Sequence, residues 1–463
     1  MFLFLLILNV FNPTFIQDLS PPKIVVGKVL ILGNKKTKEY IIARELDLKS
    51  GDTLQEAEMA DRLEKNRRKI FNLNLFLTTK AEFLPTANPV VYDVQITVKE
   101  QWYIFPFPIF IIADRNLNEW WTEKNGDLSR TTLGLALRHK NFRGRAEEIK
   151  INVGLGFTNF YDFFYRIPYI DKAQKTGLTY GISYSNDRNL RYNTSSDKLL
   201  DLRTDNLLRN RFYSNVVLRR RNKFYDFQFL ELRYNYNRIA DTVAKLNPTY
   251  FLNQQTKQRF FQVGYNYTYD FRDKVQYPLR GHFFSVQVNK LGLLPSDNVN
   301  TFDLTITLAK YHALSQRWFV SLQGKTRLSA PNKQAFLQTR GFGYGTDFVR
   351  GYELYVIDGQ RLGYLKTNLR YQALDKVFDI KRYLKMSQFN TLPLAIYPNI
   401  FLDFGYVANQ FANTNNSKLA NKMLMGYGID LDFVSWYNGV FRLGYVFNKE
   451  GQSGLRYSFG REF

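Results

Sequence analysis

Residues 261–271 read FQVGYNYTYDF, with apolar or aromatic side chains at the odd positions and polar or small ones at the even positions. Because successive side chains of a β-strand point to opposite faces, this alternation predicts a strand with one apolar and one polar face. The same period recurs between turn-like breaks, for example in Phe302–Leu308, Leu365–Ala373 and Phe441–Phe447. The chain from Leu128 onward is therefore predicted to be all-β.

A closed membrane barrel explains this pattern better than a soluble sandwich. The 463 residues include 40 Phe, 31 Tyr and 5 Trp, yet the mean hydropathy is −0.34. One face of the strands is long and aromatic, whereas the other is too polar and too charged to fill a sandwich core. A barrel satisfies every strand backbone within lipid and leaves no open edge.

The length of the β-rich part predicts sixteen strands. Residues 128–463 then supply about 21 residues per strand and turn, and the number is even, as in bacterial single-chain barrels. Fifteen strands are clear in the sequence, and residues 187–221 form an ambiguous hairpin. With sixteen strands both ends of the barrel chain lie on the periplasmic side, and residues 341–360 join strands 11 and 12 on the outer face.

The N-terminus carries a sustained apolar run, Met1–Phe11, which is too short to span a bilayer as a helix. A polar stretch follows, so residues 1–17 are predicted to be a signal peptide cleaved near Gln17, with a start-site artefact or an uncleaved tail as the alternative. The absence of cysteine excludes disulfides and thiolate sites. The net charge of +23 is spread along strand-like segments, so we expect no nucleic-acid binding.

Residues 23–100 have the pattern of a small α+β domain in the order β-α-α-β-β. Thr53 and Glu56 have the spacing of a capping box, which predicts a helix beginning there. The domain resembles a POTRA domain in its I-x-G-N-x-x-T start at Ile31, its Arg44-Glu45 pair and its FLTT strand at residues 76–79. The resemblance implies a periplasmic module whose exposed sheet edge accepts an extended client strand. A simple spacer is the alternative.

Residues 101–127 contain two prolines, Pro106 and Pro108, and seven aromatic residues. We interpret this segment as an aromatic linker that leads from the small domain to a membrane–water interface, where amphipathic rings are enriched. An ordinary hydrophobic interdomain linker is the alternative. The barrel is then predicted to occupy residues 128–463, with its first strand at about Thr131–Arg138.

The long loop GFGYGTDFVRGYELYVIDGQ at residues 341–360 is rich in glycine and aromatic residues and carries Arg350. Long loops without secondary structure are usually functional. In the strand IFLDFGYV, Ile400 and Leu402 belong to the lipid-facing set, which places Asp403 inside the barrel. If the loop folds into the lumen, Arg350 can form a bidentate pair with Asp403. An exposed loop arginine is the alternative.

Three motifs carry a resemblance to the BamA/TamA superfamily of outer-membrane barrels, and to its surface-antigen members with a single POTRA domain. They are VRGY at 349–352, FLDFG at 401–405 and YDFRDKVQYPLRG at 269–281. The resemblance implies that the loop arginine is held inside the barrel against the strand motif. The residues it singles out are Val349, Arg350, Gly351, Tyr352, Phe401, Asp403, Gly405, Asp270, Arg272, Asp273, Pro278 and Gly281.

The last strand, from Leu455 to Phe463, resembles an outer-membrane targeting signal in Tyr457, Phe459 and the terminal Phe463, although Arg461 interrupts its apolar face. The resemblance implies a bacterial outer-membrane protein with its N-terminal domain in the periplasm. We expect a factor that assists insertion of other outer-membrane proteins through a seam between the first and last strands. A dedicated translocation pore and a structural surface-antigen barrel are the alternatives.

We expect no enzymatic activity, no cofactor and no metal site. The three histidines, His139, His282 and His312, lack metal-ligand spacing, and the sequence contains no Gly-x-Ser-x-Gly elbow. The expected partners are unfolded outer-membrane or secreted proteins and the lipid bilayer. Lipopolysaccharide and accessory envelope proteins are further candidates.

Overall fold

The computed structural model describes residues 23–114, 117–171, 173, 175–223, 225–382, 391–435 and 439–459. The expected signal peptide, residues 1–17, and the terminal Phe463 lie outside the described residues. The chain divides into two compact units. The first holds the described residues up to Tyr103 together with Lys140–Glu147, and the second holds Ile104–His139 and the described residues from Glu148 onward.

The first unit is a four-stranded sheet with two helices. Its elements are β1 (Lys23–Leu32), α1 (Glu39–Ala43), β2 (Thr53–Gln55), α2 (Met59–Phe71), β3 (Phe76–Pro85) and β4 (Val91–Glu100). The strand order is β2-β1-β4-β3, and β1 and β4 run parallel. Ile42, Ile70 and Val94 are fully buried in its core. The predicted capping box is wrong, because Thr53 lies in β2 and α2 begins after a 3₁₀ turn at Glu56–Glu58.

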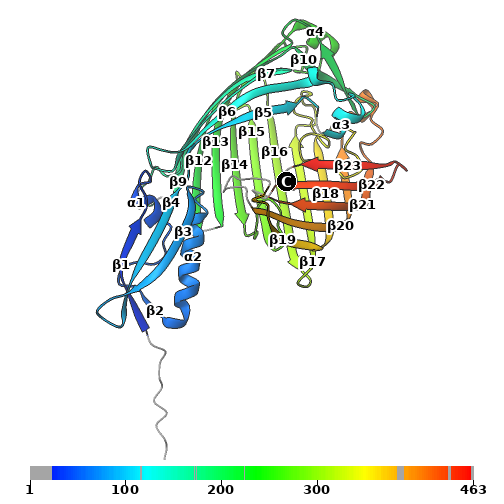
Figure 1. Ribbon diagram of the computed structural model, residues 1–463. Coiled ribbons are helices and arrows are strands. Elements are labelled where there is room, and N and C mark those ends of the chain that lie inside the picture. The colour runs from blue at the N-terminus through cyan, green and yellow to red at the C-terminus, as the bar shows by residue number, and fades with distance from the viewer. Residues whose placement is uncertain are drawn as a thin grey trace, which may run out of the picture. The chain divides into compact units, whose positions relative to one another are not determined.

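The second unit is a closed barrel, as the alternation predicted. Figure 1 shows its strands side by side in a curved wall. The barrel strands are β5 (Ile104–Ile112), β6 (Thr131–Phe142), β7 (Glu147–Gly156), β8 (Thr158–Ile167), β9 (Thr176–Asp187), β12 (Arg209–Lys223), β13 (Asp226–Ile239), β14 (Lys257–Asp270), β15 (Gly281–Leu291), β16 (Thr301–Ala313), β17 (Trp318–Ala330), β18 (Arg361–Tyr371), β19 (Leu374–Asp379), β20 (Thr391–Ala408), β21 (Met423–Val434), β22 (Val440–Asn448) and β23 (Ser453–Phe459).

The predicted number of sixteen strands is confirmed when β18 and β19 are counted together, but only fifteen of the described barrel strands lie within residues 128–463, because the first strand is β5. Both pair antiparallel with β20, and only Gln372 and Ala373 separate them. They therefore form one interrupted strand of the described barrel. In this count β17 is strand 11 and β18/β19 is strand 12, so residues 341–360 lie in the predicted connection.

The ambiguous hairpin at residues 187–221 lies only partly outside the barrel wall, because its end, from Arg209 onward, belongs to the barrel strand β12. β9 pairs directly with β12, and β10 (Asn189–Ser195) and β11 (Lys198–Arg203) form a separate two-stranded sheet in their connection.

We call the end of the barrel where β5 begins the near end, and the opposite end the far end. The β9–β12, β17–β18 and β20–β21 connections, and α4 (Asp241–Leu246) between β13 and β14, lie at the far end, where Figure 1 shows α4 beside β10.

The prediction of a linker at residues 101–127 is wrong, because this segment contains β5, the first strand of the barrel. The barrel therefore begins before residue 128, and the expected first strand at Thr131–Arg138 lies in β6, the second. Pro106 and Pro108 suggested a break, but β5 keeps an uninterrupted antiparallel register with β6. Proline is tolerated where its missing N–H faces away from the paired neighbour.

Candidate functional site

The loop at residues 341–360 is packed among other residues rather than exposed. Phe342 and Ile357 form an isolated β-bridge, and Val349 and Tyr352 are almost fully buried. Both side chains belong to an apolar cluster with Leu362 and Leu424 of the barrel wall. The loop is therefore ordered by apolar contact with the inner face of the barrel.

Arg350 of this loop is paired with Asp403 of β20. Its Nε donates to Asp403 Oδ2 at 2.7 Å and its Nη2 to Oδ1 at 2.5 Å, and the side chains are 8% and 0% exposed. The guanidinium also donates to Asn368 Oδ1 at 2.7 Å and to the Thr367 carbonyl at 3.0 Å. It lies 3.8 Å over the ring centre of Phe401. The structure thus brings the two sequence motifs together in one buried, bidentate contact.

Glycines let the loop backbone approach the wall. Gly351 has φ of +91°, a left-handed conformation that favours glycine. A Cβ at Gly405 would lie 2.3 Å from Val349, and a Cβ at Gly426 would lie 1.7 Å from the Arg350 carbonyl oxygen. Gly426 was not predicted, because its role depends on the pairing of β20 with β21.

Charged residues that the sequence did not single out surround this contact. Asp430 Oδ2 lies 3.5 Å from Arg350 Nη1 and 3.2 Å from Arg456 Nη1. Lys366 stands directly opposite Asp403 in the β18–β20 register. Its ammonium lies 4.5 Å and 4.8 Å over the rings of Phe348 and Tyr364, and it has no hydrogen bond or ion pair with any described residue. Alternation alone could have placed Asp430 and Lys366 in the lumen.

The motif at residues 269–281 forms the tight connection between β14 and β15 at the near end. Arg272 binds both carboxylate oxygens of Asp270, at 2.7 and 2.8 Å. Asp273 Oδ1 accepts from the backbone N–H of Leu279 at 3.0 Å, and the Pro278 carbonyl accepts from Arg370 at 3.2 Å. Gly281 has φ of +103°. These contacts shape the turn and bind it to the lumen wall, with no sign of a reactive arrangement.

The barrel closes where β23 neighbours β5, which we call the seam. Ala113 N–H donates to the Arg130 carbonyl in the β5–β6 register, so the backbone N–H and C=O groups of the odd residues of β5 point towards β6. The even residues, which include Pro106 and Pro108, therefore direct their backbone groups towards β23. Two of the five even positions in β5 thus have no N–H to donate across the seam.

The β23 side of the seam holds two of the predicted targeting residues. Asn448 N–H donates to the Gln452 carbonyl, so the backbone N–H and C=O groups of the even residues of β23 point towards β22. Those of the odd residues, including Tyr457 and Phe459, point towards the seam. Tyr457 N–H donates to Asn118 Oδ1 of α3 (Leu117–Thr122) at 3.4 Å. A side chain of α3 thus accepts from one of the backbone donors on the seam edge of β23.

The described residues contain no helix long and apolar enough to cross a bilayer. They also contain no group of three or more His, Cys, Asp or Glu side chains arranged to hold a metal ion.

Comparisons with known proteins agree with this geometry. The family described as "Omp85 superfamily domain" matches residues 141–463, and "Surface antigen variable number repeat", a POTRA family, matches residues 24–101. The outer membrane protein assembly factor BamA of Nitratidesulfovibrio vulgaris is 28% identical over 79 residues, which cover 17% of this chain and 10% of that protein. A relative from Treponema pallidum (strain Nichols) is 29% identical over 135 residues, 28% of this chain and 14% of that protein. The chain thus spans a small part of the length of these relatives.

Two solved structures share the fold over 94% of this chain. BamA from Haemophilus ducreyi lacking POTRA domains 1–3 has a TM-score of 0.58 at 14% identity over 84% of its chain. CdiB from Escherichia coli has a TM-score of 0.56 at 11% identity over 76% of its chain. The Omp85 match covers well over half of the chain, and it places the barrel in the outer membrane and the POTRA domain in the periplasm. The chain belongs to the Omp85 superfamily, as an outer-membrane barrel with a single POTRA domain.

Proposed function

We propose that this protein assists the insertion of other outer-membrane β-barrel proteins, and that it does so without enzymatic activity. The client enters the membrane at the seam between β5 and β23, after the POTRA domain has received it as an extended strand. The clients are unfolded outer-membrane proteins, and the lipid bilayer is the solvent into which they are released.

The observation that carries the proposal is the pair of prolines on the seam edge of β5. An unsatisfied backbone group in lipid costs several kcal/mol. Pro106 and Pro108 cannot donate, so the edge of β5 that faces β23 lacks two backbone N–H groups. A client strand without proline offers those two donors. At about 0.5–1.5 kcal/mol net per hydrogen bond, exchange of β5 for a client strand gains about 1–3 kcal/mol.

The POTRA domain offers a place for the first encounter. β3 is an edge strand of ten residues that pairs on one side only, with β4. Its exposed residues include Leu77, which is 46% exposed. Addition of an extended segment to such an edge uses backbone hydrogen bonds and accepts many sequences, which suits a protein with varied clients.

Depletion of the protein, followed by quantification of the outer-membrane proteome, tests the proposal. A broad fall in other β-barrel proteins is the expected result. Loss of a single secreted or surface protein, with the barrels intact, would instead identify a dedicated translocation pore. A sixteen-stranded barrel is wide enough for an aqueous channel, which keeps that alternative in view.

A seam variant tests the mechanism. Substitution of both prolines, Pro106→Val with Pro108→Val, supplies two N–H donors and should strengthen the seam, so that client assembly slows while the barrel becomes more resistant to unfolding. Phe107→Val is the matched control, because the N–H of residue 107 faces β6. Normal assembly by a double-proline variant with a strengthened seam would rule out exchange at this edge.

A further inference from the structure

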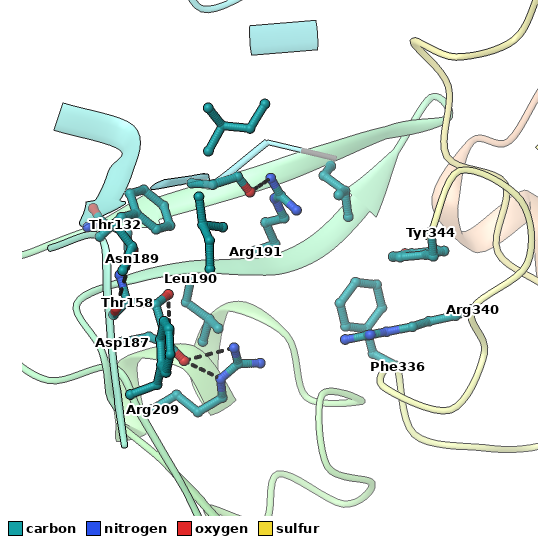
Figure 2. Close-up of a pocket in the computed structure, with 16 residues that line it drawn as sticks. Thr132, Thr158, Asp187, Asn189, Leu190, Arg191, Arg209, Phe336, Arg340 and Tyr344 are labelled. Atoms are coloured by element: carbon teal, nitrogen blue, oxygen red, sulfur yellow. Dashed lines mark hydrogen bonds and ion pairs between the residues drawn. The ribbon is translucent and has the colours of Figure 1, made fainter. Parts of the chain in front are cut away.

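A cavity of about 300 Å³ lies at the far end of the lumen. It is lined by the barrel wall, by β10 and β11, and by the β17–β18 connection. Figure 2 shows Asp187 and Arg209 of the wall on one side of the cavity, and Phe336, Arg340 and Tyr344 of the connection on the other. The volume is at the lower end of the range of small-molecule sites in proteins, so the cavity has room for a small ligand.

The cavity is formed before any ligand enters it. Leu190 of β10 lines the cavity and belongs with Phe336 to one apolar cluster, which fixes the base of the β10–β11 hairpin. In the hairpin turn, Asp197 Oδ2 accepts from the backbone N–H groups of Lys418 at 2.7 Å and Leu419 at 3.1 Å. Because the hairpin is bound at its base and at its turn, a ligand does not pay to order this wall.

Three arginines and one carboxylate line the cavity. Arg209 is neutralised by this carboxylate, since its Nε and its Nη2 each lie 2.8 Å from Asp187 Oδ2. The guanidinium of Arg191 lies 3.6 Å from Asp114 and 3.8 Å from Asp201, neither of which lines the cavity. The third arginine therefore gives the cavity a surplus of positive charge.

This third arginine, Arg340, is available to a ligand. Its side chain is exposed and makes no hydrogen bond or ion pair with any described residue, and its guanidinium lies 5.2 Å over the ring centre of Tyr344. Asp358, whose charge acts on Arg340, already accepts from the Tyr344 hydroxyl at 2.7 Å. In Figure 2 the Arg340 guanidinium points towards the side of the cavity that holds Arg209. A guanidinium in this position can bind an oxyanion through two parallel hydrogen bonds.

A buried acceptor in the cavity points to a ligand that also carries a hydroxyl group. Asn189 lines the cavity, and its buried Oδ1 has no hydrogen-bond partner among the described residues. Buried polar atoms in folded proteins are nearly always paired, and a ligand hydroxyl supplies the missing donor. Phe157, Phe160 and Phe336 add apolar ring surface to the lining. An oxyanion, hydroxyl groups and an apolar face occur together in phosphorylated sugars.

We propose that this cavity binds a sugar phosphate, with Arg340 holding the phosphate group and Asn189 accepting from a sugar hydroxyl. The aromatic side chains pack against the apolar face of the sugar ring. The phosphorylated sugar is a free solute or the head group of a glycolipid, and both present the same chemistry to the site. This inference concerns a ligand of the folded barrel and does not depend on the proposed assembly function.

Isothermal titration calorimetry of the folded, full-length protein in detergent micelles tests the site, with glucose 6-phosphate, glucose and inorganic phosphate as probes. Glucose 6-phosphate should bind more tightly than glucose or inorganic phosphate. Arg340→Gln should weaken its binding about tenfold or more, the scale expected for hydrogen bonds to a charged group. The variant should fold normally, because this guanidinium makes no hydrogen bond to a described residue. Arg361→Gln, an exposed arginine outside the cavity, is the matched control and should bind like the wild type.

A second variant separates the two contacts. Asn189→Ala should weaken the binding of glucose 6-phosphate and leave that of inorganic phosphate unchanged, whereas Arg340→Gln should weaken both. Competition with a phosphorylated glycolipid distinguishes the sources, since displacement of glucose 6-phosphate identifies a lipid head group and its retention a free solute, and either result agrees with the site. The proposal is wrong if the folded wild type does not bind glucose 6-phosphate, if glucose binds equally well, or if folded Arg340→Gln binds like the wild type.

Discussion

The Arg350–Asp403 contact permits a quantitative prediction. Removal of Arg350 leaves the Asp403 carboxylate buried without its main partner. Arg350→Ala strands Asp403, which is fully buried. Breaking a buried pair in this way costs about 3–5 kcal/mol of unfolding free energy. The Asp403 carboxylate, however, has Lys366 directly across in the β18–β20 register.

Lys366 lowers the expected cost of losing Arg350. Its ammonium rests on the ring of Phe348, a residue of the same loop as Arg350. When the loop loses its anchor, Phe348 leaves with it and Lys366 is free to pair with Asp403. We therefore expect Arg350→Ala to cost about 3 kcal/mol, the lower limit for a broken buried pair, and about 5 kcal/mol in a Lys366→Met background.

The assay is urea unfolding in lipid vesicles, followed by the difference in gel mobility between folded and unfolded barrel. Arg350→Ala with Asp403→Ala should cost at least about 1 kcal/mol less than the sum of the single substitutions, as neighbours in contact do. Additive losses would refute direct pairing of Arg350 with Asp403. If Arg350→Ala costs the same unfolding free energy with Lys366 and with Met at position 366, then Lys366 does not replace Arg350 as the partner of Asp403.

Two further predictions concern close approach and pH. Gly426→Ala places a methyl group against the Arg350 carbonyl and should destabilise the barrel by about 1–3 kcal/mol. Gly324→Ala is the control and should be tolerated, because the atoms nearest to its added methyl group are 3.8 Å away or more. Unfolding by urea measures both. In the POTRA domain, burial opposes ionisation of Glu100, but hydrogen bonds from Thr37 and Lys36 outweigh it and lower the pKa of its carboxyl below the ordinary 4.5. The carboxylate therefore stabilises the domain above that pH, and the benefit is lost as pH falls through the lowered pKa. In the wild type, the protection of the Lys36 and Thr37 amides against hydrogen exchange, relative to the intrinsic rate at each pH, should fall as the pH drops through that lowered pKa. Glu100→Gln should show the reduced protection already at neutral pH.

The barrel and its loop could be predicted because their signals are local. A period of two over ten residues identifies a strand wherever it lies, and VRGY and FLDFG each fit within five residues. Asp403 could be placed in the lumen from the alternation of its own strand. The pairing with Arg350 then needed only a loop long enough to fold inward.

The features that the sequence did not predict depend on register or on distant contacts. Pro106 and Pro108 read as strand breakers, since the direction of a missing N–H is known only once β5 is paired with β6. The β18–β20 register places Lys366 opposite Asp403, and this register cannot be read from either strand alone. Asp197 lies more than two hundred residues from its partners, and no spacing rule connects an acidic turn residue to the backbone of Lys418 and Leu419.

The seam and the inserted loop have opposite energetic designs, and the contrast bears on the route of a client. In the loop, Arg350 donates to both carboxylate oxygens of Asp403, and Val349 and Tyr352 are almost fully buried. At the seam, two backbone donors are missing from the edge of β5 that faces β23, and one β23 donor is bound by the side chain of Asn118. Under the proposed function, a passage through the lumen must release the loop and its Arg350 anchor, whereas a passage at the seam opens an edge that lacks two donors. We therefore infer that the lateral route has the lower barrier.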